Sequence, residues 1–359
     1  MLEHGGRLRH AAQQYGIPLT NWLDLSTGIN PNGWPVPTIP AECWQRLPED
    51  NDDLLVAAGH YYQNSSLLPV AGSQAAIQAL PALRSVCRVG VLHPAYAEHA
   101  ASWEKAGHQV NIIAAEHISS QLENLDVLII INPNNPTGKR WKPAQLLDWH
   151  ARLSQRNGWL IVDEAFMDGT PDYSLSAYPT RPGLIVLRSI GKFFGLAGIR
   201  CGFVIADQSI LHPLTEQIGP WSISHPARYV AAKALMDKDW QTQTTQDLAH
   251  HSSRLQQLLI DHGWPPSGSS AMFQWIKTDA APTLQEHLAR QGIFTRLFHE
   301  PNSLRFGLPK DEPDWQRLEH ALSQISAEIQ LLDQMTQSTS PDLVNDSCSF
   351  LINQSSKIA

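Results

Sequence analysis

The stretch RSIGKFFGLAGIRCG, residues 188–202, places a single lysine, Lys192, among glycines and aromatic residues. Ser189 lies three residues before this lysine, and Arg200 lies eight residues after it. A lysine in an apolar, crowded setting loses its proton more readily, and the neutral amine is the form that Schiff-base chemistry requires. A solvent-exposed loop lysine is the alternative, but the apolar and glycine-rich neighbours argue against it.

Three motifs upstream of this stretch each follow a short apolar run: AGSQAAI (71–77), NPNNPTG (132–138) and DEAF (163–166). A Gly-Ser turn that opens a helix offers backbone N–H groups and a hydroxyl to a phosphate, although an ordinary turn with Ser73 as the helix N-cap fits equally. In NPNNPTG, the asparagines beside proline can direct a side-chain amide toward a ligand, or the segment can be an ordinary turn. Asp163 either lies where open α/β sheets bind ligands or caps a helix.

The apolar runs predict buried strands, because they are short, rich in Val, Ile and Leu, and separated by helical patterns such as Gln74–Arg84 and Pro143–Arg156. The runs are Leu67–Ala71, Val89–His93, Val110–Ala114, Val127–Ile131, Leu160–Asp163, Leu184–Leu187 and Phe203–Ala206. This alternation predicts an α/β domain with a mostly parallel sheet.

The remainder of the chain suggests three further regions. Residues 1–45 are Pro-rich and irregular, and we expect them to form an arm that joins a smaller domain. The large domain is then expected at 46–225 and a smaller α+β domain at 226–335. In the smaller domain we expect helices at Pro226–Met236, Gln243–His262, Thr283–Gln291 and Trp315–Met335, and strands at Ala271–Lys277 and Leu304–Leu308. Residues 336–359, rich in Ser, Thr, Asn and Gln, are expected to be a disordered tail.

Composition excludes several classes of protein. The 359 residues are 42% hydrophobic and 17% charged with a net charge of −8, so the chain folds around a large core and has no general field for nucleic acid or an anionic membrane. The longest aliphatic run is far shorter than the ~20 residues that span a bilayer. The cysteines, Cys43, Cys87, Cys201 and Cys348, form no CxxC, and the 16 histidines show no ligand spacing, so we expect no metal. We expect a cytoplasmic protein.

The order and spacing of the motifs resemble those of the fold-type I pyridoxal-phosphate (PLP) enzymes, the aspartate aminotransferase superfamily, over nearly the whole chain except the tail. Within it the chain resembles the branch that holds histidinol-phosphate aminotransferases and threonine-phosphate decarboxylases. The supporting segments are HGG (4–6), DLSTGINP (24–31), LPED (47–50), LPVAGSQ (68–74) and LRFGLP (304–309). The resemblance implies a mostly parallel central sheet flanked by helices, a smaller α+β C-terminal domain and a homodimer.

The resemblance also implies a role for each candidate site residue. Lys192 is the Schiff-base lysine, Asp163 the partner of the pyridine nitrogen, and Tyr96 the aromatic residue that stacks on the cofactor ring. The remaining cofactor contacts are Asn135 at the phenolic oxygen and Gly72, Ser73, Gln74, Ser189 and Arg200 around the phosphate. The substrate contacts are Arg305 at the α-carboxylate, Arg296 and His4 at a substrate phosphate, and Gly28 and Asn135.

The likeness to the decarboxylases implies decarboxylation of L-threonine O-3-phosphate, and a histidinol-phosphate-type aminotransferase is the alternative. Phe166 stands where many relatives have tyrosine, and Leu47 stands where the aminotransferases often have tyrosine before Pro-Asp. Both departures argue against the interpretation of the chain as an aminotransferase, although neither excludes it. A non-catalytic ligand-sensing domain is disfavoured, because Lys192 is retained and residues 1–45 contain no helix-turn-helix or basic arm.

Overall fold

Strand β5 (Val127–Ile131), the most apolar run of the sequence, lies at the centre of the larger sheet with all five residues buried. Val127 and Ile129 join one hydrophobic cluster, whereas Leu128 and Ile130 join another, so the two faces of the strand enter different cores. A strand covered on both faces needs apolar residues at every position, which explains the unbroken run.

The computed structural model describes residues 4–338, with side chains described through residue 325. The larger sheet has seven strands in the order β2-β8-β7-β6-β5-β3-β4. Its strands are β2 (Leu67–Val70), β3 (Arg88–Leu92), β4 (Gln109–Ile113), β5, β6 (Trp159–Asp163), β7 (Leu184–Ser189) and β8 (Gly202–Ile205). Strand β8 runs antiparallel to both of its neighbours, and the other pairs are parallel. The mostly parallel sheet and its seven runs are therefore confirmed to within one or two residues.

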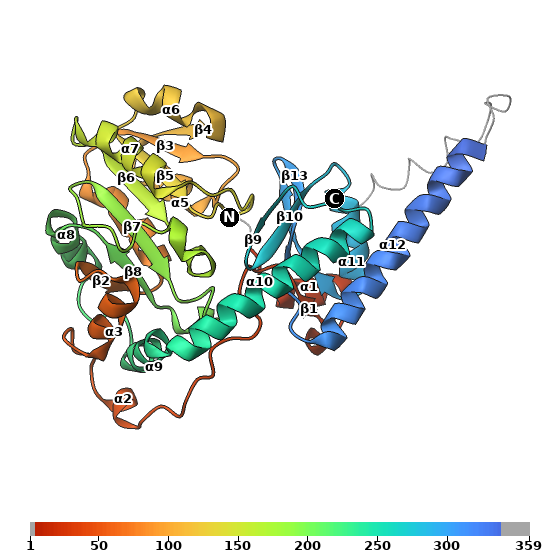
Figure 1. Ribbon diagram of the computed structural model, residues 1–359, viewed down its shortest axis with the longest axis horizontal. Coiled ribbons are helices and arrows are strands. Elements are labelled where there is room, and N and C mark those ends of the chain that lie inside the picture. Colours follow the sequence, from red (N-terminus) through yellow and green to blue (C-terminus); the bar gives the residue numbers. More distant parts are fainter. Residues whose placement is uncertain (1–3, 339–359) are drawn as a thin grey trace.

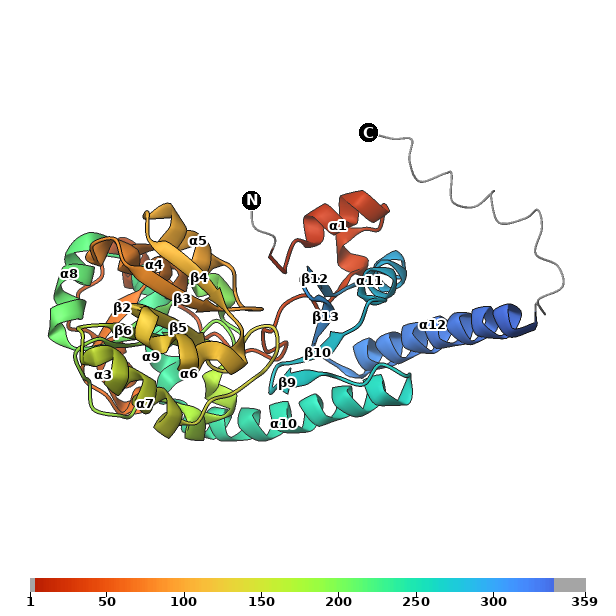
Figure 2. The same ribbon diagram turned by 90° about the horizontal axis from the view of Figure 1, so that it is seen from above.

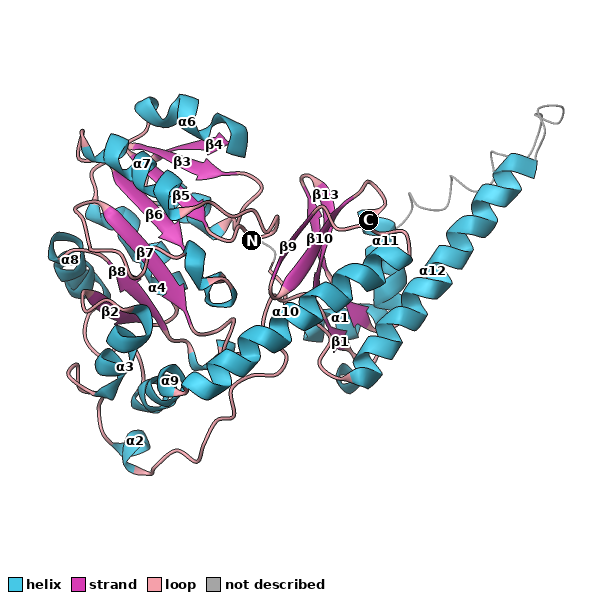
Figure 3. Ribbon diagram, in the orientation of Figure 1, coloured by secondary structure: helices cyan, strands magenta, loops and turns pink. Residues whose placement is uncertain are grey.

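Helices cover both faces of this sheet (Figures 1 and 3). One face packs against α4 (Ser73–Ala79), α5 (Glu98–Lys105) and α8 (Gln208–Ile218). The other packs against α3 (Asp53–Tyr62), α6 (Ile118–Gln121), α7 (Pro143–Ser154) and α9 (His225–Met236). The short helix α2 (Glu42–Gln45) also contacts α9. Both layers follow from the alternation of strands and helices along the chain.

A second body carries an antiparallel four-stranded sheet in the order β12-β13-β10-β9 (Figure 2). Its strands are β9 (Gly268–Ser270), β10 (Phe273–Lys277), β12 (Arg296–His299) and β13 (Asn302–Gly307). Helices α10 (Lys238–Asp261), α11 (Ala281–Arg290) and α12 (Glu312–Ser338) accompany it, and α10 extends from the larger body to the smaller one (Figure 1). None of the described helices is long and apolar enough to cross a bilayer.

The N-terminal segment contains more regular structure than the sequence predicts. Helix α1 spans Leu8–Tyr15, and strand β1 (Leu23–Asp24) pairs in parallel with β11 (Ile293–Phe294). The expectation of irregular structure was therefore wrong at Leu8–Tyr15. Helix α1 has one well-buried residue, Ala11, and it packs in a cluster with Ala289 and Phe294. These partners lie far along the chain, so the local sequence does not show the contact. The segment contacts the smaller body through this pairing.

Three other expectations need adjustment. The helix expected at Pro226–Met236 in the smaller domain is α9, which packs against α3 on the larger body. The helix expected at 74–84 ends at Ala79 and continues as a 3₁₀ turn, Leu80–Leu83, because Pro81 lacks the N–H that an α-helix would use. The tail expected at 336–359 lies outside the described residues except for 336–338, which end α12.

Candidate active site

Polar residues gather where the central parallel strands end. Asp163 ends β6, Ser189 ends β7, and Asn135 lies in the loop after β5. Asp163 pairs in register with Ile131 of β5 and with Leu187 of β7. Because the carboxyl ends of parallel strands meet at one edge of a sheet, these three residues lie together at the place where open α/β sheets bind ligands.

A cavity of about 150 Å³ opens at this edge. It is lined by all nine predicted cofactor contacts: Gly72, Ser73, Gln74, Tyr96, Asn135, Asp163, Ser189, Lys192 and Arg200. Ile131, Ala165 and Phe166 complete the wall. Motifs that are far apart in the sequence therefore form a single chamber with a lysine, a carboxylate and several hydroxyl and amide groups.

Lys192 lies in an environment that favours its neutral form. Burial, followed by the nearby charge of Arg305, lowers the pKa of Lys192 to about 8, although Asp163 acts in the opposite direction. Its Nζ lies 5.4 Å from the centre of the Phe166 ring. An amine with a pKa near 8 is partly neutral at physiological pH, as a nucleophilic lysine must be.

Asp163 is buried and held by two hydrogen bonds. The backbone N–H of Ala165 donates to its Oδ1 at 3.0 Å, and Nε2 of His99 lies 3.0 Å from its Oδ2. His99 is itself buried and lies edge-on to the ring of Tyr96. The sequence analysis missed His99, because its contact with Asp163, 64 residues away in the chain, depends on which face of α5 packs toward the sheet. Its contact fixes the direction of the carboxylate that faces the cavity.

The glycine that lies beside Arg200 in this cavity is required by its surroundings. Gly72 has φ = +72°, and a Cβ added there would lie 2.6 Å from Nη2 of Arg200. A side chain at this position would therefore displace the arginine and strain the backbone. Ser73 and Ser189 supply hydroxyl groups to the same chamber.

A second cavity of about 240 Å³ adjoins the first, with Tyr96, Asn135, Phe166 and Lys192 lining both. It is also lined by the other predicted substrate residues: His4, Gly28, Arg296 and Arg305. Phe298 of β12 lines it as well, and the sequence analysis missed this residue because it predicted no strand there. All thirteen predicted site residues thus line one or both cavities.

Arg305 is a buried cation with donors to spare. Its Nη1 donates to Oδ1 of Asn135 at 2.5 Å and its Nη2 donates to the carbonyl of Ser26 at 2.9 Å. Its Nε is buried without a hydrogen-bond partner among the described residues. Burial and then the charge of Arg296 lower the pKa of Arg305. An anion in the adjoining cavity would compensate this charge.

The two arginines lie opposite each other because of strand register. Arg296 of β12 pairs with Arg305 of β13 in the antiparallel ladder. Like charges directly opposite on neighbouring strands are destabilising. Both arginines line the same cavity, so the sheet places two positive charges on one of its walls. A negatively charged ligand bound there would offset their mutual repulsion.

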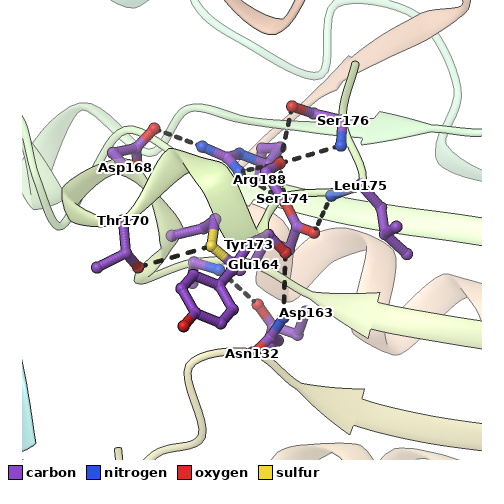
Figure 4. Close-up of polar contacts among 12 residues, drawn as sticks. Asn132, Asp163, Glu164, Asp168, Thr170, Tyr173, Ser174, Leu175, Ser176 and Arg188 are labelled. Carbon is purple, nitrogen blue, oxygen red and sulfur yellow. Dashed lines mark hydrogen bonds and ion pairs between the residues drawn. The ribbon is translucent and has the colours of Figure 1, made fainter. Parts of the chain in front are cut away.

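A buried ion-pair cluster begins at Glu164, the residue that follows Asp163 (Figure 4). Arg188 donates from Nη1 to Glu164 at 2.7 Å and from Nη2 to Asp168 at 2.5 Å. Ser174 and the backbone N–H of Leu175 also donate to Glu164, whose pKa is raised by burial. Because Glu164 follows Asp163 and Arg188 precedes Ser189, the cluster ties together the ends of β6 and β7.

Comparison with known proteins agrees with this architecture. Residues 50–325 match the family model described as aminotransferase class I and II, and the chain belongs to this family. The structure of the Sinorhizobium meliloti histidinol-phosphate aminotransferase in complex with pyridoxal-5'-phosphate matches with a TM-score of 0.79, covering 91% of this chain and 96% of that one at 20% identity. The fold is that of the fold-type I aminotransferases.

Sequence relatives are more specific. The chain is 56% identical to the threonine-phosphate decarboxylase of Pseudomonas aeruginosa over 322 residues. This matched region covers 90% of this chain and 97% of that protein. It is 40% identical to the threonine-phosphate decarboxylase of a Sinorhizobium species, over 90% of this chain and 98% of that protein. A histidinol-phosphate aminotransferase of Yersinia pestis is 29% identical, over 77% of this chain and 76% of that protein.

Proposed function

We propose that the chain is a PLP-dependent carboxy-lyase that converts L-threonine O-3-phosphate to (R)-1-aminopropan-2-ol O-phosphate and CO2, for the aminopropanol arm of cobalamin. The observation that carries the proposal is the 56% identity to a threonine-phosphate decarboxylase over nearly the full length of both chains. The charge of the two cavities agrees with a substrate that bears both a carboxylate and a phosphate.

The residues of the 150 Å³ cavity fit pyridoxal phosphate. Gly72, Ser73, Gln74, Ser189 and Arg200 would hold its phosphate. Asp163 would bind its ring nitrogen, Asn135 its phenolic oxygen and Lys192 its aldehyde carbon, with Tyr96 stacked on the ring. When bound, this group supplies an electron-accepting ring that stabilises negative charge on the substrate α-carbon.

The two ends of the substrate would be held by different parts of the chain. Arg305, which is buried and whose Nε has no hydrogen-bond partner among the described side chains, would bind the α-carboxylate through its fork of N–H donors. Arg296 and His4, which line the same cavity, would bind the phosphate. Two anchors fix the orientation of the α-carbon, and orientation selects which of its bonds is broken.

Lys192 would then control the proton at the α-carbon. With a pKa lowered to about 8, its amine exchanges a proton readily near neutral pH. In decarboxylation it donates this proton to the α-carbon after CO2 leaves, or leaves a water to do so. In transamination it would instead remove the α-proton, so the same residue serves either reaction and the anchors decide between them.

The deciding experiment is product identity. Purified enzyme supplied with PLP and phosphothreonine should release CO2 and aminopropanol phosphate without a keto-acid acceptor, and Lys192→Ala should abolish turnover while the fold survives. Absolute dependence on 2-oxoglutarate, with glutamate formed in step with turnover, would establish a histidinol-phosphate-type aminotransferase instead. Equal turnover of threonine and phosphothreonine would remove the role of the phosphate anchor.

The proposal includes the setting of the enzyme. We place it in the cytoplasm as a homodimer with sites at the subunit interface, and without nucleic-acid or membrane partners. Light scattering of the active enzyme tests this assembly, because a fully active monomer would contradict it.

A further inference from the structure

Glu98, the first residue of α5, joins the N-terminal arm to the walls of both cavities. Nε2 of His4 lies 2.8 Å from its Oε1, and Nε2 of Gln74 donates to its Oε2 at 2.9 Å. Oε1 of Gln74 in turn accepts a hydrogen bond from the hydroxyl of Tyr96 at 3.1 Å. Both carboxylate oxygens of Glu98 are therefore used, and its side chain is only 19% exposed.

His4 lies in a partly exposed segment, so a polar partner for its side chain helps to fix the position of the ring. Its side chain is 43% exposed, and it precedes the first helix of the chain. Gly6 anchors the segment by donating its backbone N–H to Oγ of Ser26 at 2.7 Å. The imidazole itself lies 5.9 Å from the ring of Tyr96, ring centre to ring centre. Among residues 4–325, whose side chains the structure describes, the contact with Glu98 is the hydrogen bond of the His4 ring beside the substrate cavity.

The carboxylate of Glu98 lies outside the cavity in which the substrate phosphate would bind, so its negative charge is kept away from that phosphate. Glu98 does not line the 240 Å³ cavity, whereas His4, Arg296 and Arg305 do. An imidazole that donates from Nε2 to a carboxylate keeps Nδ1 for another partner, and in the protonated ring that atom is also a donor. A carboxylate behind the histidine thus orients a donor without placing its own oxygens against an anion.

We propose that Glu98 is a positioning residue for the substrate phosphate, acting by holding His4 at the cavity while Gln74 fixes the carboxylate from the other side. This proposal rests on the proposed function, in which His4 binds the phosphate. It assigns to Glu98 a role in the recognition of a phosphorylated substrate and none in the chemical step.

The kinetic test compares Glu98→Ala, Glu98→Gln and Glu104→Ala, the last of which changes an exposed glutamate on the same helix. Glu98→Ala should raise KM for phosphothreonine roughly 5- to 10-fold and leave kcat within about twofold, because a hydrogen bond to a partly exposed charged pair is worth about one kcal/mol. Glu98→Gln keeps an acceptor for His4 and should recover most of the loss. Glu104→Ala should behave as the wild type.

A second measurement does not depend on turnover. In the apoenzyme, hydrogen exchange of segment 4–8 should be roughly 5- to 10-fold faster in Glu98→Ala than in the wild type. Phosphothreonine at saturation should slow this exchange in the wild type and have less effect in Glu98→Ala. His4→Ala and the double variant His4→Ala/Glu98→Ala should have the same KM, because the two residues act as one unit.

The possible failures are distinguishable. If the wild type releases no CO2 from phosphothreonine, the proposed function fails, and the exchange experiment alone decides the role of Glu98. Unchanged KM and unchanged exchange in Glu98→Ala would overturn the Glu98 proposal even with a fully active wild type. So would a fall in kcat or PLP affinity without a rise in KM, because that pattern indicates a general structural role.

Discussion

Replacing Arg305 by methionine should separate substrate binding from folding. Methionine fills much of the same volume, but it removes the donors that we assign to the α-carboxylate. A bidentate, charge-assisted pair contributes about 3 kcal/mol or more, so kcat/KM for phosphothreonine should fall at least about 100-fold. The bound cofactor should remain, because Arg305 does not line the cofactor cavity.

The fold should tolerate this change. The substitution removes the hydrogen bonds from Arg305 to Asn135 and to the Ser26 carbonyl, but it also removes a buried cation whose pKa is lowered by desolvation. These effects oppose each other, so we expect the free energy of unfolding to change by less than about 2 kcal/mol. Differential scanning fluorimetry and CO2 release measure the two quantities. Arg290→Met, at a 72% exposed arginine on α11, is the matched control.

The same variant has a pH signature. The charge of Arg305 lowers the pKa of Lys192, so its removal should raise that pKa above the wild-type value of about 8. Covalent capture of PLP by the apoenzyme requires the neutral amine, so its rate should rise with pH through a midpoint that moves upward in the variant. A variant with kcat/KM within threefold of the wild type and an unmoved midpoint would refute the assignment of Arg305.

Three further predictions concern the cofactor cavity and its support. In the wild-type apoenzyme the rate of PLP capture should rise to half its maximum near pH 8, and a midpoint near 10.5 would show that Lys192 is not desolvated. Gly72→Ala should weaken PLP binding at least about tenfold in a fluorescence titration, because the added Cβ would lie 2.6 Å from a guanidinium nitrogen of Arg200. Gly16→Ala is the control: Gly16 has a similar φ of +67° and open space around it, so this variant should bind PLP as the wild type does. Arg188→Met should lower the free energy of unfolding by about 3–5 kcal/mol in urea, because it leaves two buried carboxylates without their cation. Arg88→Met, at an exposed ion pair, should lower it far less. Equal losses in the two arginine variants would contradict the burial argument.

The central sheet was predictable because its strands obey a local rule. A parallel strand covered on both faces must be apolar at every position, and the run at 127–131 shows this without any knowledge of its neighbours. Strand β12, with the sequence RLFH, is at an edge of the small sheet and has no fully buried residue, so the same rule gives no signal there.

The sequence predicted those site residues that belong to recognisable motifs. It did not predict the contacts that depend on strand register or on helix packing. The glycines and polar residues after each strand could be identified from their positions along the chain. The juxtaposition of Arg296 and Arg305 depends on the register of β12 with β13. Likewise, the contacts of His99 and Glu98 depend on which face of α5 packs toward the sheet. Neither the strand register nor the orientation of this helix can be predicted from the residues next to each site residue.

The active site draws on chain segments that are paired in three separate sheets. Asp163 and Ser189 belong to the seven-stranded sheet, Arg305 to the four-stranded sheet, and the segment around Gly28 follows the strand that pairs with β11. Cofactor binding and substrate binding therefore report on different parts of the folding reaction. During refolding, the return of cofactor fluorescence tracks the large sheet, whereas protection by substrate requires every segment to be in place. A molecule in which the large sheet is folded but the smaller body is not in place should therefore bind the cofactor and fail to turn over the substrate.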